Sequence, residues 1–231
     1  MWILALDSST ETGSCALLED GILRAQIFLC NGNTHSTTLL PAVEQILRFA
    51  SLDPAGIDAF ACTIGPGSFT GIRIGAATVK GLAFRQNKPC FGLSTLEALA
   101  ENLRGVTGTV LPVLDARRNQ VYTARFQSSG SELVRMTEDC ILPLEDLASY
   151  VPEGPVYLCG DAVSAARTVL PDAVCLPHAA QPLAASVAEL ARRRFEAGER
   201  PSDLALHPLY LRLPQAEETL RQKLAGAKSE S

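Results

Sequence analysis

The sequence predicts an α/β protein made of two similar halves, and three observations support this prediction. An apolar run at 57–64, short enough for a buried strand, is followed by a helical pattern at 69–85. Two stretches, one starting at Trp2 and the other at Val110, each show a strand pattern ending in an acid, then a turn and a second strand pattern, which suggests an internal duplication. The chain has 231 residues, 47% of them hydrophobic, which is enough for one large or two small cores.

The charge and the cysteines exclude several classes of protein. A net charge of −5 gives no general basic surface, so this chain alone is a poor candidate for binding nucleic acid. The cysteines are odd in number and never form C-x-x-C, which favours a reducing cytosol over a disulfide framework. No apolar segment reaches about 18 residues, so we expect a soluble, cytoplasmic protein without a membrane contact.

The first expected strand, at 2–7, ends in the carboxylate of Asp7 and leads into the hydroxyl-rich turn Ser8, Ser9 and Thr10. Strands at 15–19 and 22–29 follow and are joined by an Asp-Gly hairpin turn. An acid beside hydroxyls and amides suits a phosphate and its metal ion. The alternative is a local turn in which the acid caps nearby amides.

The most constrained stretch, at 63–75, contains the turn between the strand at 57–64 and the helix at 69–85. Gly65 and Gly67 are free to take positive φ angles, Pro66 fixes one φ angle, and Ser68 is expected to cap the helix. Such a turn is an anion site, although its spacing matches neither a dinucleotide fingerprint nor a Walker motif. The candidate phosphate or nucleotide site consists of Asp7, Ser8, Ser9, Thr10, Gly65, Gly67 and Ser68.

Two helices, at 36–50 and 69–85, carry more apolar surface than one core needs. The second is apolar or small nearly all round, apart from Arg73 and Lys80 on one line. One interpretation is that these helices are sandwiched inside their own domain, and the other is that one face belongs to another protein chain. Under the second interpretation, the partner-interface residues are Leu39, Ala42, Val43, Phe49, Ile72, Ala76, Val79 and Ala83.

The rest of the chain continues the alternation of strands and helices. We expect strands at 90–93, 110–114, 120–126 and 156–159, and helices at 95–103, 144–150 and 183–198. We expect an N-terminal subdomain at 1–103 that carries the partner helices, a C-terminal subdomain at 104–213 and a mobile tail at 214–231.

Four segments resemble the TsaB (YeaZ) family, which is related to the TsaD or "glycoprotease" family. These are ILALDSST at 3–10, GPGSFTGIR at 65–73, NKP at 87–89 and YLR at 210–212. The likeness is dense over the first hundred residues, looser to residue 213 and absent from the tail. It implies an actin-like ATPase (ASKHA) fold, with two ribonuclease-H-like subdomains whose mixed sheets are flanked by helices.

The resemblance also implies a function. TsaB proteins pair with TsaD, and a TsaE-type ATPase completes an assembly that transfers a threonylcarbamoyl group to adenosine 37 of tRNA, giving t6A. We therefore expect a non-catalytic subunit that forms a heterodimer with TsaD, contacts the ATPase through the complex and touches tRNA only indirectly. For the isolated chain, both a homodimer and a monomer stay open. It would have no tightly bound cofactor, with weak ATP or ADP binding in the complex.

The comparison with TsaD also shows a difference in ligands. TsaD carries two histidines four residues apart that help to hold a metal ion, and the corresponding positions here are Thr95 and Leu99, which offer no imidazole. The remaining histidines, His35, His178 and His207, match no ligand spacing. We therefore expect no metal site and no catalytic residue.

Two other functions were weighed against the partner subunit. An independent actin-like kinase or ATPase is supported by Asp7, Asp115 and the Gly160-Asp161 turn. A metallopeptidase, as the older family label suggests, fails because the chain lacks H-E-x-x-H and G-x-S-x-G elements. The partner subunit is the interpretation that we adopt.

Overall fold

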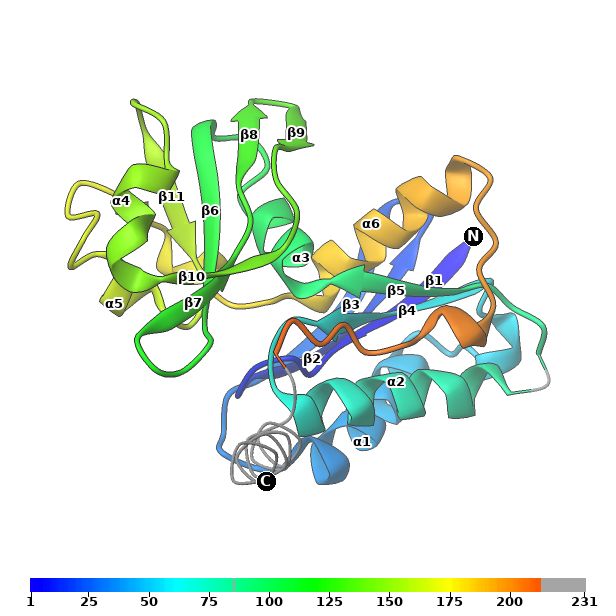
Figure 1. Ribbon diagram of the computed structural model, residues 1–231. Helices are drawn as coiled ribbons and strands as arrows, with labels where there is room; N and C mark the ends of the chain where they lie inside the picture. The colour runs from blue at the N-terminus through cyan, green and yellow to red at the C-terminus, as the bar shows by residue number, and fades with distance from the viewer. Residues whose placement is uncertain (85, 213–231) are drawn as a thin grey trace, which may run out of the picture.

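The computed structural model describes residues 1–84 and 86–212, which form two α/β units, each built around its own sheet (Figure 1). The sheet of the first unit has the strand order β3-β2-β1-β4-β5. Its strands are β1 (Trp2–Asp7), β2 (Gly13–Glu19), β3 (Ile22–Leu29), β4 (Ala59–Gly65) and β5 (Cys90–Ser94). The sheet is mixed: β1, β2 and β3 are antiparallel neighbours, whereas β4 and β5 run parallel to β1.

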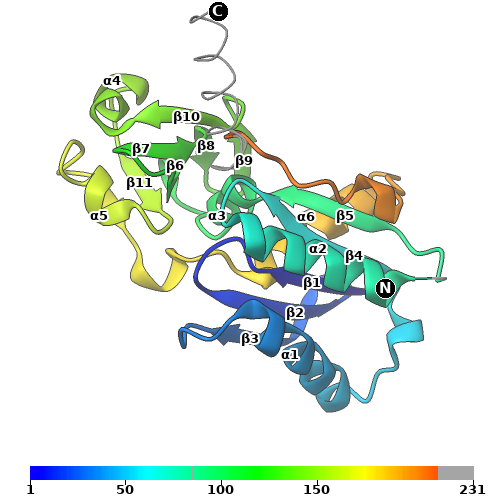
Figure 2. The ribbon, with the colours of Figure 1, turned by 60° about the horizontal axis from the view of Figure 1, so that its bottom comes forward.

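Helices cover both faces of this first sheet. α1 (His35–Phe49) and α2 (Phe69–Ala83) lie side by side on one face, and α6 (Ala184–Glu196) lies on the other (Figures 1 and 2). Successive strand residues point to opposite faces, so Leu4 and Leu6 enter the core beneath α1 and α2, while Ile3 and Ala5 enter the core beneath α6. β1 is therefore buried on both sides, which is why it reads as one continuous apolar run.

The second unit contains the other sheet, with the order β10-β7-β6-β11-β12, and off this path β8 pairs with β6 and β9 pairs with β8. Its strands are β6 (Thr107–Asp115), β7 (Gln120–Thr123), β8 (Phe126–Ser129), β9 (Glu132–Arg135), β10 (Cys140–Pro143), β11 (Val156–Cys159) and β12 (Val174–Cys175). The short helices are α3 (Thr95–Glu101), α4 (Leu147–Tyr150) and α5 (Val163–Ala166). Single 3-10 turns lie at Pro54–Gly56, Leu144–Asp146, Pro177–Ala179 and Asp203–Ala205.

The structure corrects two predicted elements. The strand expected at 120–126 is divided into β7 and β8, which pair with opposite ends of β6. Between them the amide of Arg125 donates to the Thr137 hydroxyl instead of to a neighbouring strand. The helix expected at 144–150 begins as the 3-10 turn Leu144–Asp146 and becomes α-helical only at Leu147.

The predicted C-terminal subdomain, 104–213, does not correspond to one spatial unit. Within that range, α6 packs on the first sheet, where Val187, Ala188 and Ala191 share a core with Ile3 and Ala61. The chain thus leaves the first unit, builds the second sheet and then returns. The expected tail, 214–231, lies outside the described residues.

The basic run of α6 is paired with acids of its own unit and of α3. Arg193 forms an ion pair with Glu101, and Arg194 forms one with Glu97. Arg192 pairs with Glu189 one turn earlier. These contacts fix α6 against α3. None of the described helices is long and apolar enough to cross a membrane.

Candidate functional site

The turn between β1 and β2 is organised around the buried carboxyl group of Asp7. Its Oδ1 accepts hydrogen bonds from the hydroxyls of Ser9 and Thr63, each at 2.6 Å. Its Oδ2 has no hydrogen-bond partner among the described residues. Burial raises the pKa of Asp7 above its ordinary value, although these hydrogen bonds act in the opposite direction.

The N-terminus of α2 lies directly on this turn. The Ser8 hydroxyl donates to the carbonyl of Gly71 at 2.9 Å, and the amide of Ser68 donates to the carbonyl of Ser9 at 2.7 Å. The Ser68 hydroxyl accepts from the Gly71 amide at 3.2 Å, so Ser68 is the predicted N-cap. A Cβ atom at Gly67 or Gly71 would overlap the carbonyl oxygen of Ser9 or Ser8. Glycine is needed at both positions because the two backbones are in contact.

The structure brings most of the predicted phosphate-site residues together, and their polar atoms form hydrogen bonds with one another or with neighbouring residues. Thr10 bonds to the hydroxyl of Thr12, and a Cβ on Gly65 would lie 2.6 Å from the carbonyl oxygen of Leu209. A phosphate at the start of α2 would have to displace the Ser8–Gly71 and Ser68–Ser9 hydrogen bonds. Asp7 Oδ1 accepts from one hydroxyl of its own turn and from the hydroxyl of Thr63 on β4, and nucleotide binding stays a prediction.

The two positions that correspond to the TsaD histidines are buried. Leu99 packs in the core between α3 and β6, and Thr95 is buried, with no hydrogen-bond partner for its hydroxyl among the described residues. His35 instead begins α1, where its Nε2 lies 2.8 Å from the carbonyl oxygen of Thr10. Over residues 1–84 and 86–212, no group of three or more His, Cys, Asp or Glu side chains is arranged to hold a metal ion.

A second acidic turn follows β6, as the repeated pattern predicts. Asp161 accepts the amide of Asp115 at 2.8 Å, and Asp115 accepts the amide of Arg117 at 2.7 Å. Asp161 is exposed to solvent, yet partial desolvation by the surrounding chain raises its pKa, and the negative charges of Asp115 and Glu11 add to this shift. Glu11 belongs to the β1–β2 turn, so the acidic turns of the two units face each other. Glu11 is missing from the predicted site residues, because no pattern in the sequence indicates that its turn lies near Asp161.

Seven of the eight residues predicted to face a partner are buried inside the chain. They are Leu39, Ala42, Val43, Ile72, Ala76, Val79 and Ala83. For these seven the prediction was wrong, because a side chain with almost no exposed surface has none to offer to another chain. Their apolar spacing marks the side of each helix that packs on the sheet, as the sandwiched interpretation requires. Only Phe49, 73% exposed, remains available.

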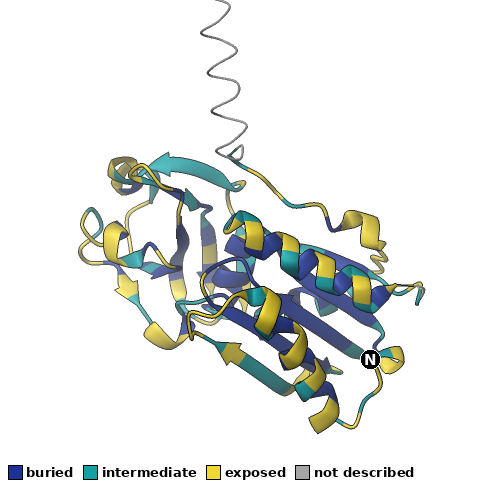
Figure 3. Ribbon diagram, turned by 90° about the horizontal axis from the view of Figure 1, so that it is seen from below, coloured by how far each residue is buried: buried dark blue, intermediate teal, exposed yellow. Residues whose placement is uncertain are grey.

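The outward side of the same helices carries a different set of residues. On α2 it forms a stripe, the α2 stripe, in which exposed residues recur every three or four positions. The α2 stripe consists of Thr70, Arg73, Ala77, Gly81 and Phe84. Phe84 is 72% exposed, and Leu40 on α1 is 45% exposed. Figure 3 shows this outward surface of α1 and α2 side by side, with the buried sides turned toward the sheet.

Comparison with known proteins identifies the family. The sequence matches the TsaD family, described as tRNA N6-adenosine threonylcarbamoyltransferase, over residues 31–218. It is 33% identical over 225 residues to the tRNA threonylcarbamoyladenosine biosynthesis protein TsaB of Bacillus subtilis, covering 94% of this chain and 96% of that protein. The chain belongs to the TsaB (YeaZ) family. The predicted resemblance is thereby confirmed.

Solved structures agree with the family and with the predicted fold. YeaZ from Pseudomonas aeruginosa superimposes with a TM-score of 0.77 and 30% identity, covering 91% of this chain and 99% of that one. The (R)-2-hydroxyglutaryl-CoA dehydratase component A of Acidaminococcus fermentans superimposes with a TM-score of 0.52 at 11% identity, a likeness of fold alone. The TsaB-family chain therefore has the predicted actin-like fold.

Proposed function

We propose that this chain is a non-catalytic partner subunit of the tRNA N6-threonylcarbamoyladenosine transferase complex, which dimerises with TsaD and supports its activity. Its relatives in Bacillus subtilis and Escherichia coli are named as tRNA threonylcarbamoyladenosine biosynthesis proteins. Membership of their family supports a role in the same process. The TsaE-type ATPase joins through the complex, and tRNA is contacted only indirectly.

The observation that carries the proposal is a group of large hydrophobic side chains on the outward surface of α1 and α2. Leu40 and Phe49 are exposed on α1, and Phe84 is exposed directly after the end of α2. On α2, the exposed residues Ala77 and Gly81 have little or no side chain. A Cβ placed on Gly81 would have no neighbouring atom within 4 Å. Exposed apolar patches of this kind mark protein–protein contacts, and small residues allow a second helix to approach closely. The same surface would serve a homodimer when TsaD is absent.

The non-catalytic assignment rests on the residues that fill the two candidate chemical sites. Thr95 and Leu99 supply no imidazole where TsaD has its histidines. The hydroxyls of Ser8 and Ser9 are already used by Gly71 and Asp7. We propose that the chain binds no cofactor tightly and holds ATP or ADP only weakly, within the complex.

Reconstitution with purified TsaD, the TsaE-type ATPase, unmodified tRNA, ATP and threonylcarbamoyl-adenylate as the donor of the transferred group tests this function. We expect t6A to form only when this chain is present with TsaD, and we expect the chain alone to transfer nothing and to hydrolyse no ATP. Nucleoside analysis by mass spectrometry measures the product. Transfer or ATP turnover by the isolated chain, abolished by Asp7→Ala, would contradict the non-catalytic assignment. Full modification without this chain would contradict the partner role.

A further inference from the structure

The segment 201–212, which we name the strap, runs along the first unit and reaches the second (orange in Figure 1). At its start the amide of Cys90 donates to the carbonyl of Pro201 at 2.8 Å. Farther along, Leu206 is buried in the core shared with α1 and α2. The amide of Leu209 donates to the carbonyl oxygen of Ile64 at 2.6 Å. The strap is therefore anchored to the first unit at several points along its length.

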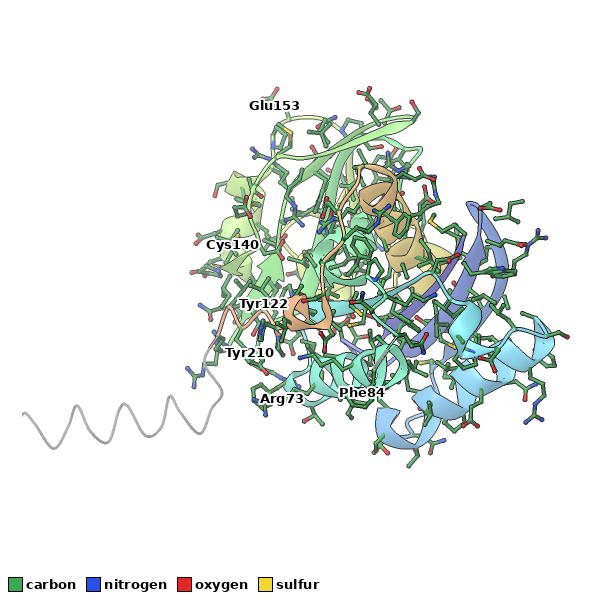
Figure 4. The ribbon with its side chains drawn as sticks, turned by 90° about the vertical axis from the view of Figure 1, so that its right-hand side faces the viewer. Arg73, Phe84, Tyr122, Cys140, Glu153 and Tyr210 are labelled. Carbon is green, nitrogen blue, oxygen red and sulfur yellow. The ribbon has the colours of Figure 1, made fainter. Side chains whose placement is uncertain are left out.

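The last residues of the strap contact both units. The Tyr210 ring stacks on Phe69 with centroids 5.0 Å apart, and its hydroxyl accepts from Arg73 Nε at 2.8 Å. Figure 4 shows Arg73 and Tyr210 close together near the N-terminal end of α2. Two residues later, the Arg212 guanidinium donates to the Ala116 carbonyl and to the Gln120 side chain in the β6–β7 turn. The α2 stripe and the second unit are thus joined through Tyr210, Leu211 and Arg212.

The β6–β7 turn that receives Arg212 has an unusual backbone. Arg117, Arg118 and Asn119 have φ angles of 64°, 54° and 56°, in the left-handed region that non-glycine residues rarely occupy. The turn is closed by the bond from the Ala116 amide to the Gln120 carbonyl. Such a conformation persists where surrounding contacts hold it, and Arg212 supplies contacts on both sides of it.

We propose that the strap couples the α2 stripe to the β6–β7 turn, so that a protein docked on α2 at Arg73 stabilises the position of the second unit. Arg73 links the α2 stripe to the strap, because it lies in the stripe and donates a hydrogen bond to Tyr210 of the strap. The identity of the docked protein rests on the proposed function. The coupling itself is a property of the free chain.

Hydrogen exchange measured by mass spectrometry on the full, isolated chain tests this coupling. Arg212→Ala should speed exchange of the amides at 116–120 by roughly tenfold, because it removes the contacts that hold the turn. Arg73→Ala should accelerate the same amides, although Arg73 lies on the other unit. Arg48→Ala replaces an exposed arginine of α1 that lies outside the strap and serves as the matched control, with no expected effect at 116–120.

The double variant distinguishes transmission through the strap from a general loosening. Arg73→Ala should add nothing at 116–120 once Arg212 is already alanine. Tyr210→Phe removes the hydroxyl that Arg73 donates to but keeps the stacking on Phe69 and the guanidinium over both rings, so it should give part of the Arg73→Ala effect at 116–120. Unchanged exchange at 116–120 in Arg212→Ala, or an additive effect in the double variant, would overturn the proposal. Because TsaD is absent from this experiment, neither result bears on the proposed function.

Discussion

At the scale of single residues, the carboxyl group of Asp7 connects separate parts of the first unit. Its carboxyl accepts two hydroxyl hydrogen bonds and is fully buried, so it joins the end of β1 to Ser9 and to Thr63 on β4. Burial disfavours the charged form and raises the pKa of Asp7. The group therefore links the stability of the fold to pH.

The direction in which the stability of the fold depends on pH gives a prediction. Because the folded pKa of Asp7 lies above the ordinary value of 3.8, the folded chain binds the proton more tightly than the unfolded chain does. The resulting stabilisation is present at low pH and is lost as the pH rises through the raised folded pKa. Asp7→Asn stays neutral, so we expect the parent to lose stability relative to this variant as the pH rises from the ordinary value of 3.8 toward the raised folded pKa.

Urea unfolding followed by circular dichroism measures this difference. The exposed Asp172 provides the control, since Asp172→Asn should track the parent across the range. A parallel pH dependence for the parent and Asp7→Asn would show that the carboxyl is not the source of the effect.

At the scale of elements, two glycines of α2 lie in opposite surroundings, and only the first fixes how closely the helix approaches the β1–β2 turn. Gly71 lies against the carbonyl oxygen of Ser8, whereas Gly81 lies in open space on the outward side of the helix. A methyl group at the first position must push α2 away from the β1–β2 turn. A methyl group at Gly81 would have no neighbouring atom within 4 Å.

Two alanine substitutions test this contrast. Gly71→Ala should destabilise the chain by roughly 3–5 kcal/mol because the added Cβ overlaps backbone that cannot move freely. Gly81→Ala should stabilise it by about 0.5–1 kcal/mol, the ordinary gain in helix propensity. Thermal melting of the free chain distinguishes the two. Equal effects would mean that α2 does not rest on the turn as described.

The elements also show what could be predicted from the sequence. The strand at 2–7 and the Ser68 cap followed from hydrophobic spacing and local hydroxyls, which need no tertiary information. The outward side of α2 could not be predicted, because that helix is apolar or small nearly all round. Ala76 and Ala77 are identical neighbours, yet the sheet covers the first and leaves the second exposed. The division of 120–126 into β7 and β8 likewise depends on Thr137, a distant residue.

At the scale of the whole molecule, the chain crosses between its two units more than once. It builds the first sheet, then the second, returns as α6 to cover the first sheet, and ends with the strap that reaches back to the β6–β7 turn. Sequence order alone suggested two consecutive subdomains, because nothing local to α6 or to the strap indicates what it packs against. This arrangement leaves the outward surface of α1 and α2 exposed (Figure 3), with Leu40 and Phe49 as large hydrophobic side chains on it.

The affinity of Ala77→Arg for TsaD, measured by isothermal titration calorimetry, tests the central claim that this outward surface is the docking face. Ala77 is exposed, so the free variant should melt like the parent, with the long arginine reaching water. In the complex the same charge would be buried without a partner, at a cost of roughly 3–5 kcal/mol, which corresponds to an affinity lower by at least about a hundredfold. Ala165→Arg, an exposed alanine on α5 in the second unit, is the matched control and should bind like the parent. If Ala77→Arg binds TsaD as tightly as Ala165→Arg does, the docking face lies elsewhere.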